Sequence, residues 1–226
     1  MTTSRRMLVV SPHCDDAVLS CGDLLRGNPG TAVVTVFAGS PPSRPASTDW
    51  DRRSGFAAGD DVMAARREED RLALTALSAE PEWLPFVDDQ YDAPRSEGDV
   101  ATALGATIDR LGPSRVVIPL GLFHPDHRLA HDAAVVALRA RRIPEWIAYE
   151  EATYRRVQGM VEERVSALRG AGLALTRWPG TQSSASAEKC RAVACYASQL
   201  RALSSLGPSA VADVYRPERY WRVGTE

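Results

Sequence analysis

Short apolar segments alternate with amphipathic segments along the first two thirds of this chain. Apolar runs rich in β-branched residues are typical of strands buried on both faces of a parallel sheet. The strands that we predict are residues 7–10, 31–37, 83–87, 115–118 and 145–149. The helices that we predict between them are residues 17–25, 61–78, 100–111 and 129–141. Because parallel strands are joined by right-handed βαβ units, this order predicts an α/β fold, an open, mainly parallel sheet with helices on both faces.

The pattern is less regular after residue 150. We predict helices at residues 154–169 and 186–203 and a strand at residues 173–178. A chain of 226 residues fits one domain. We therefore expect a single domain with a core at residues 5–150 and a C-terminal extension at residues 151–226.

Composition and charge exclude several classes of partner. The net charge of −2 gives no electrostatic reason to expect nucleic acid as a partner. No apolar run approaches the ~20 residues of a membrane-spanning helix, so we expect no stable membrane insertion. The apolar run at residues 7–10 is too short for a signal peptide, which favours a cytoplasmic protein with its four cysteines as free thiols. The sequence leaves open whether the protein forms a homo-oligomer.

All four histidines lie in two short clusters. The first cluster is Ser-Pro-His-Cys-Asp-Asp at residues 11–16, and the second is His-Pro-Asp-His-Arg at residues 124–128, with His131 in the helix predicted next. Each cluster closely follows a predicted strand. Because ligands collect at the carboxyl ends of strands in open α/β sheets, we expect the two clusters to meet in space.

The two clusters supply the donors of a hydrolytic metal site. A catalytic zinc has three protein ligands and an open position. His13, His127 and one of the adjacent carboxylates Asp15 and Asp16 make three ligands, and the other carboxylate can act as a general base. This donor set suits zinc but accepts other divalent metals.

Two further residues of the second cluster have chemical roles in this hypothesis. His124 can face the substrate carbonyl and, when protonated, stabilise an oxyanion. Asp126 lies between two histidines and can orient one of them. For His131 we predict a structural role.

The two motifs together resemble those of the PIG-L/LmbE-like zinc-dependent de-N-acetylases. The resemblance implies a Rossmann-like fold and removal of an N-acetyl or other N-acyl group from an amino sugar, a related small glycoside or a natural-product intermediate. The partner it implies is a small N-acylated sugar-type substrate. Carried over by motif position, the zinc ligands are His13, Asp16 and His127, the general base is Asp15, and the oxyanion-stabilising residue is His124 with Asp126 behind it.

Weaker matches extend the resemblance to substrate-binding residues. Arg66 lies in Arg-x-x-Glu, which resembles the family's helix after a long loop, where the arginine is near the substrate. Asp88 resembles the family's aspartate after the third strand. A C-terminal Lys…Tyr-x-Ser-Gln segment, residues 189–199, also matches. For Trp50, in the structureless loop expected at residues 38–60, two predictions stay open: a contact with substrate, or a role as the anchor of a lid.

The sequence departs from the family pattern at two positions. Cys14 stands where the family often has proline, and Ala17 where it often has glutamate. Neither position is a ligand in the family's scheme. We expect Cys14 to place an oxidisable, metal-avid side chain beside the metal.

Three alternatives to a sugar deacetylase remain. One is a zinc amidase that cleaves a larger conjugate. Another is a metal-binding pseudoenzyme, although metal retention alone would not require Asp15 and His124. The last is a dinucleotide-dependent oxidoreductase. The first predicted βα turn, residues 11–17, contains no glycine and so lacks the phosphate-binding fingerprint of such enzymes.

Overall fold

A single mainly parallel sheet forms the centre of the computed structural model, which describes residues 7–41, 47–181, 183–207 and 209–225. Its strands within these residues are β1 (Met7–Ser11), β2 (Ala32–Thr35), β3 (Glu80–Trp83), β4 (Arg115–Pro119), β5 (Glu145–Tyr149), β6 (Leu173–Trp178) and β7 (Tyr220–Thr225). The order is β3-β2-β1-β4-β5-β7-β6. The first five are parallel, whereas β7 is antiparallel to both of its neighbours. The expected α/β fold is confirmed.

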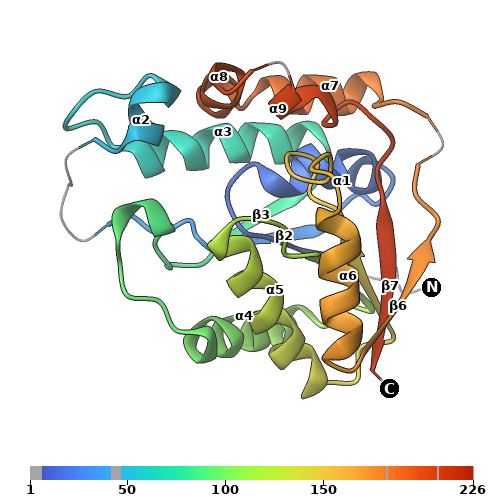
Figure 1. The fold of residues 1–226 in the computed structure, drawn as a ribbon. Coiled ribbons are helices and arrows are strands. Elements are labelled where there is room, and N and C mark those ends of the chain that lie inside the picture. Colours follow the sequence, from blue (N-terminus) through green and yellow to red (C-terminus); the bar gives the residue numbers. More distant parts are fainter. Residues whose placement is uncertain (1–6, 42–46, 182, 208, 226) are drawn as a thin grey trace.

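Helices cover both faces of the sheet (Figure 1). Those on one face are α1 (Asp16–Arg26), α3 (Val62–Ala76), α7 (Ala187–Ala194) and α8 (Ala197–Ser205), with the short α2 (Asp49–Ser54) and α9 (Ser209–Ala212) beside them. Those on the other face are α4 (Glu97–Leu111), α5 (Pro125–Arg139) and α6 (Met160–Gly170). None of the helices in the described ranges is both long and apolar enough to cross a lipid bilayer.

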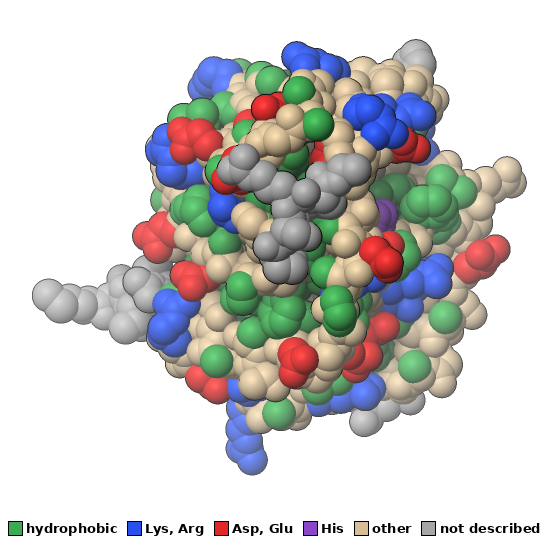
Figure 2. All heavy atoms as spheres, turned by 90° about the vertical axis from the view of Figure 1, so that its left-hand side faces the viewer, with side chains coloured by type: hydrophobic (Ala, Val, Ile, Leu, Met, Phe, Trp, Pro, Cys, Tyr) green, Lys and Arg blue, Asp and Glu red, His purple; other side chains and the backbone are tan. Residues whose placement is uncertain are grey.

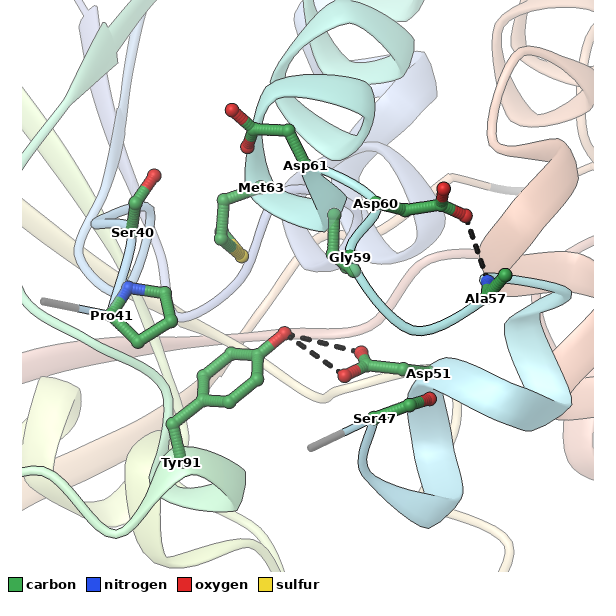
Figure 3. A pocket seen from close by; sticks show the side chains of 11 residues that line it. Ser40, Pro41, Ser47, Asp51, Ala57, Gly59, Asp60, Asp61, Met63 and Tyr91 are labelled. Atoms are coloured by element: carbon green, nitrogen blue, oxygen red, sulfur yellow. Dashed lines mark hydrogen bonds between the residues drawn. The ribbon is translucent and has the colours of Figure 1, made fainter. Parts of the chain in front are cut away.

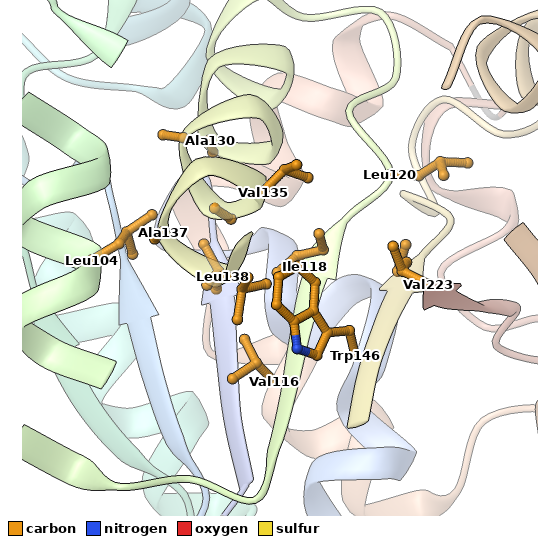
Figure 4. Packing of buried hydrophobic residues seen from close by; sticks show 14 of the residues in the cluster. Leu104, Val116, Ile118, Leu120, Ala130, Val135, Ala137, Leu138, Trp146 and Val223 are labelled. Atoms are coloured by element: carbon orange, nitrogen blue, oxygen red, sulfur yellow. The ribbon is translucent and has the colours of Figure 1, made fainter. Parts of the chain in front are cut away.

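Each face of the sheet packs its own hydrophobic core. Figure 4 shows Val116 and Ile118 of β4 against Leu104 of α4 and Leu138 of α5. Val117, between the two β4 residues, belongs to the core on the opposite face, because successive strand residues point to opposite sides. Full burial of such a side chain stabilises the fold by about 1.5–3 kcal/mol, so β4 tolerates no polar residue along its centre.

The structure corrects several predicted element boundaries. β3 lies at Glu80–Trp83 and not at residues 83–87. The helix predicted at residues 186–203 is two helices, which are separated at Tyr196 by a backbone outside the helical region. The helix predicted at residues 154–169 begins only at Met160.

The long loop and the C-terminal part contain more structure than expected. A short helix, α2, interrupts the loop at residues 38–60, and a capping box of Thr48 and Asp51 fixes its start. Residues 42–46 of that loop lie outside the described residues. Residues 151–226 contribute β6 and β7 to the central sheet, and β7 was not predicted.

The chain changes direction across the sheet between β1 and β4. These two strands are neighbours, but the chain continues from β1 toward β2 and from β4 toward β5. Such a switch point leaves a crevice at the carboxyl ends of the two strands. Both histidine motifs follow these ends.

Candidate active site

The first motif forms a tight turn between β1 and α1. Ser11 Oγ donates to the carbonyl of His13 at 2.6 Å and accepts from the amide of Ala17 at 3.0 Å. The amide of His13 donates to Asp16 Oδ2 at 2.9 Å. Asp15 stands at the N-cap position of α1, but its side chain makes no capping hydrogen bond there. The carboxylate of Asp15 is therefore not committed to capping the helix.

The second motif lies at the start of α5, which begins four residues earlier than predicted. His124 is the N-cap residue, and its Nδ1 accepts a hydrogen bond from the amide of Asp126 at 3.2 Å. Pro125 occupies the first turn, where its missing N–H costs no hydrogen bond. Asp126 and His127 follow in the same turn. The candidate catalytic and ligand residues of this motif are therefore positioned by the N-terminus of a helix and not by a loop.

Three donor atoms from the two motifs converge. Asp16 Oδ2 lies 3.1 Å from His13 Nδ1 and 3.2 Å from His127 Nε2. One ligand atom from each of these three residues lies within 4.8 Å of the others, which is the spacing of a group that could hold a metal ion. These are the three residues for which the sequence predicts a ligand role.

A carboxylate lies behind each of the two histidines. His13 Nε2 is 3.1 Å from Asp126 Oδ2, and His127 Nδ1 is 3.3 Å from Glu151 Oε1. Histidines that bind metals generally donate their second ring nitrogen to such an acceptor. The carboxylate of Asp126 thus lies behind His13. It is also near His124, because one ligand atom from each of His13, His124 and Asp126 lies within 4.8 Å of the others.

Two residues that sequence reasoning missed complete this arrangement. Glu151 is fully buried after β5, where its Oε1 also accepts from the amides of Gly121 and Leu122. Arg95 forms ion pairs with Asp126 and Asp89. The only signal for Glu151 in the sequence is an acidic pair directly after a predicted strand.

Burial and neighbouring charges shift the pKa values of the site strongly. Burial alone would raise the pKa of Asp16, but His127 and His13 outweigh it and lower that pKa. Burial would lower the pKa of His127, yet Asp16 and Glu151 raise it to about 9. Burial, together with the charge of Asp16, raises the pKa of Asp15 to about 6. Burial and the charges of His13 and His127 lower the pKa of His124 to about 4.

The motifs open into a cavity of about 170 Å³. The predicted substrate residues Trp50, Arg66 and Asp88 all line it together with the histidines. Gln199 links two of them, because its Oε1 accepts from Trp50 Nε1 at 2.9 Å and from Arg66 Nη2 at 2.6 Å. Arg66 Nη1 lies 3.4 Å from Asp88 Oδ2. The remaining lining residues are His13, Asp15, Asp16, Gln90, His124, His127, Thr153, Tyr154 and Leu203.

Two residues of the histidine clusters, Cys14 and His131, do not line the cavity. His131 is fully buried, with its Nδ1 2.7 Å from the carbonyl of Pro119, in agreement with the expected structural role. Cys14 was expected beside the metal, but it packs in a small apolar cluster with Ala38 and Met63. Burial raises the pKa of the Cys14 thiol, which disfavours the reactive thiolate.

A second cavity of about 270 Å³ lies between α2, α3 and the 3-10 turn Asp89–Tyr91 (Figure 3). Its carboxylates already have backbone or hydroxyl partners. Tyr91 donates to both oxygens of Asp51, Asp60 accepts from the amide of Ala57, and Asp61 caps α3. No histidine lines this cavity, so the smaller cavity is the candidate active site.

The fold and the site together define an α/β protein whose candidate three-ligand metal site opens into a cavity. The family model described as "PIG-L: GlcNAc-PI de-N-acetylase" matches residues 8–138. The chain belongs to this family, as its motifs predicted.

Individual relatives agree with the family. The chain is 33% identical over 147 residues to 2'-N-acetylparomamine deacetylase of Streptomyces fradiae, a match that covers 57% of this chain and half of that protein's length. A solved structure of a triple-mutant deacetylase of the teicoplanin biosynthetic pathway is 27% identical, with a TM-score of 0.78 and 98% of each chain covered. The A40926 pseudoaglycone deacetylase is also 27% identical, with a TM-score of 0.72 and 98% of each chain covered. These relatives are deacetylases by name, and the name of the first specifies an N-acetyl group.

Proposed function

We propose that this protein is a metal-dependent hydrolase that removes an N-acetyl group from an amino sugar or from a sugar-bearing natural-product intermediate. The observation that carries the proposal is the convergence of His13 Nδ1, Asp16 Oδ2 and His127 Nε2 at the edge of one cavity. The names of the relatives, a 2'-N-acetylparomamine deacetylase, a deacetylase of the teicoplanin biosynthetic pathway and the A40926 pseudoaglycone deacetylase, support this substrate class.

The residues around the cluster fit a bound cation. The carboxylates of Asp15, Asp16, Asp88, Asp126 and Glu151 surround the two histidines, and the guanidinium groups of Arg66 and Arg95 balance only part of this charge. Zinc, or another divalent metal, would be held by His13, Asp16 and His127. When bound, such a metal lowers the pKa of a water molecule and polarises an amide carbonyl.

Asp15 is the proposed general base. Its carboxylate lines the cavity next to the ligand Asp16 and does not cap α1. From there it can take a proton from the attacking water and return it to the leaving amine, which needs a proton to depart. No other carboxylate in the cavity lining is as little engaged, because Asp16 contacts both histidines and Asp88 contacts Arg66 and Gln90.

His124 is the proposed oxyanion-stabilising residue. Because its Nδ1 accepts the amide hydrogen of Asp126, a neutral His124 carries its proton on Nε2. The ring lines the cavity beside His13, with ring centroids 5.1 Å apart. A neutral Nε2–H donor can stabilise the developing negative charge on the amide oxygen without a prior protonation.

The predicted substrate residues line the same cavity as the histidines. Arg66, Trp50 and Gln199 form one hydrogen-bonded unit, and Asp88 joins it through Arg66. Hydroxyl groups of a sugar are suited to such a set of alternating donors and acceptors. We propose that this unit positions the sugar so that its acetamide faces Asp15 and His124.

Metal analysis followed by an amine-release assay tests the proposal. The purified protein is expected to contain about one divalent metal per chain, to release acetate from at least one N-acetylated amino sugar, and to lose this activity on chelation and regain it with zinc. His13→Ala should lose the metal. A matched control, Asp61→Asn, changes a carboxylate of the second cavity and should keep both metal and activity. A protein that binds no metal would refute the proposal, and so would a metal-loaded protein that is inactive across sugars and larger glycosides.

A further inference from the structure

We propose that Phe123 and Tyr154 form a stacking platform at the rim of the active-site cavity, which binds a flat apolar face of the substrate adjoining the N-acyl sugar. This inference rests on the proposed function and deepens it, because it identifies residues that select the group attached to the sugar. It starts from a backbone feature that the metal site alone does not explain.

Phe123 adopts a backbone conformation that bulky residues avoid. Its φ is +54°, and the amide of His124 donates to the carbonyl of Leu122 at 2.6 Å, so Phe123 is the central residue of a γ-turn. A γ-turn with a positive central φ is rare and strained, and glycine would adopt it at lower cost. Such strain persists where the surrounding structure holds it, which is most often at functional sites.

The side chain of Phe123 is directed to solvent. It is 60% exposed, the largest exposed fraction among the large hydrophobic side chains that the described residues leave exposed. Neither the γ-turn nor the helix start requires an aromatic side chain at this position. The exposed ring gains little from burial in the folded protein, so its apolar face remains available to a ligand.

Ring contacts connect Phe123 to the metal site. Its ring lies 5.2 Å from the ring of Tyr154, with an angle of 34° between the planes. The ring of Tyr154 in turn lies 5.2 Å from that of His127, nearly perpendicular to it, and Tyr154 lines the cavity. Phe123 and Tyr154 thus extend the cavity wall from a proposed ligand to the surface. Figure 2 shows hydrophobic side chains beside a histidine in a hollow of the surface.

The chemistry of this wall suits a flat apolar face. Aromatic rings bind other aromatic groups in offset or tilted arrangements, with a gain beyond the buried area. The apolar C–H face of a second sugar ring presents the same kind of surface. Because the acetamide must face Asp15 and His124 in the cavity, a platform at the rim contacts the group beyond the N-acyl sugar.

Three substrates test the platform: N-acetylglucosamine, its benzyl glycoside and N,N'-diacetylchitobiose. The readout is the ratio of kcat/KM for each extended substrate to that for the monosaccharide. Stacking on an aromatic ring corresponds to a ratio of roughly 3–10 in the wild type. In Phe123→Ala and Phe123→Gly this ratio should fall toward 1 through a rise in KM, and Phe123→Tyr should restore it.

The glycine variant and a surface control distinguish loss of the Phe123 ring from a loss of fold stability. Phe123→Gly removes the ring at a position whose φ suits glycine, so thermal unfolding should show a fold at least as stable as the wild type. Leu206→Ala removes another exposed apolar side chain, 58% exposed and not part of the cavity lining, and should leave the ratios unchanged. A fall with the benzyl glycoside assigns the platform to an aromatic aglycone, and a fall with the disaccharide assigns it to a sugar ring.

Binding measurements separate this inference from the proposed function. In an Asp15→Asn background, calorimetry compares the affinity for the three compounds with and without Phe123→Ala. A preference for an extended compound that Phe123→Ala abolishes supports the platform even where no variant releases acetate. Ratios and affinities that Phe123→Ala and Phe123→Gly leave unchanged refute the platform, whatever the enzymatic activity. Absence of binding by all three compounds also refutes it.

Discussion

Substitution of Glu151 by glutamine should weaken metal binding through His127. Glu151 Oε1 lies 3.3 Å from His127 Nδ1 and accepts the amides of Gly121 and Leu122 at 2.8 and 2.9 Å. Glutamine keeps an oxygen acceptor of the same size but removes the negative charge behind the ring. The imidazole then becomes a poorer donor to the metal at Nε2.

The magnitude follows from the position of Glu151. Loss of a partner behind a metal-binding histidine weakens the affinity for the metal by about 10–100-fold, or roughly 1.4–2.7 kcal/mol. The fold should also lose about 1–3 kcal/mol, because the new amide group replaces Oε2, which has no hydrogen-bond partner among the described residues.

Competition against a chromophoric chelator measures the zinc Kd, and urea unfolding of the metal-free protein measures stability. The adjacent Glu150 gives a matched control. It is equally buried but contacts Arg177 and Trp221, not a histidine. Glu150→Gln should destabilise the fold without changing the zinc Kd. The reasoning is wrong if Glu151→Gln keeps a Kd within twofold of the wild type, or if both variants weaken zinc binding equally.

Three other changes have expected outcomes. Asp15→Ala should keep its metal while kcat falls about 10²–10⁴-fold in the amine-release assay, and near wild-type turnover would exclude Asp15 as the base. Burial, followed by the charge of Arg164, lowers the pKa of His131 from 6.5 to about 4 in the folded protein. The contribution of neutral His131 to the free energy of unfolding is therefore complete above pH 6.5 and is lost as the pH falls toward 4. Urea midpoints at pH 7.5 and 5 should therefore differ less in His131→Gln than in the wild type. In the native protein, iodoacetamide at pH 8 should modify the half-buried Cys190 and Cys195 well before Cys14, and equal rates would contradict the assigned burial of Cys14.

The sequence predicts the strands of the sheet centre well because these strands are buried on both faces. β1, β4 and β5 begin where expected and end within one residue of their predicted ends, since every residue of these strands except the first of β4 and the first of β5 is buried. β3 was misplaced because it is an edge strand. Its residues, Glu80–Trp83, are half-buried or exposed and include a proline, so no apolar run marks them.

Helix ends near the site were harder to predict for a related reason. The apolar periodicity of α5 starts at Leu129, but the helix begins at Pro125 because its first turn holds site residues in place of core residues. The break between α7 and α8 also lacks a sequence signal. It lies at Tyr196, which is buried and donates its hydroxyl to Asp70, so long-range packing and not local preference fixes it.

The candidate site divides in the same way. The ligand cluster could be predicted because all four histidines lie in two short motifs that follow predicted strands, and the structure brings His13, Asp16 and His127 together. Trp50, Arg66 and Asp88 line the same cavity, and their roles remain predictions. Glu151, Tyr154 and Gln199 owe their positions to how the C-terminal part folds back over the cavity. That arrangement depends on tertiary contacts that no local pattern encodes.

The position of these last residues affects how relatives can be compared. The family match ends at residue 138, so it contains the three candidate ligands but neither Tyr154 and Gln199, which line the cavity, nor Glu151, which lies behind His127. Sequence similarity in the matched region therefore reports on the candidate ligands and on the part of the cavity wall that holds Trp50, Arg66 and Asp88, but not on the wall formed by Tyr154 and Gln199. Substitutions in the later part of the chain alter that second part of the wall without replacing a candidate ligand. Chimaeras joined after Glu151 would exchange it between two members of the family in a single step.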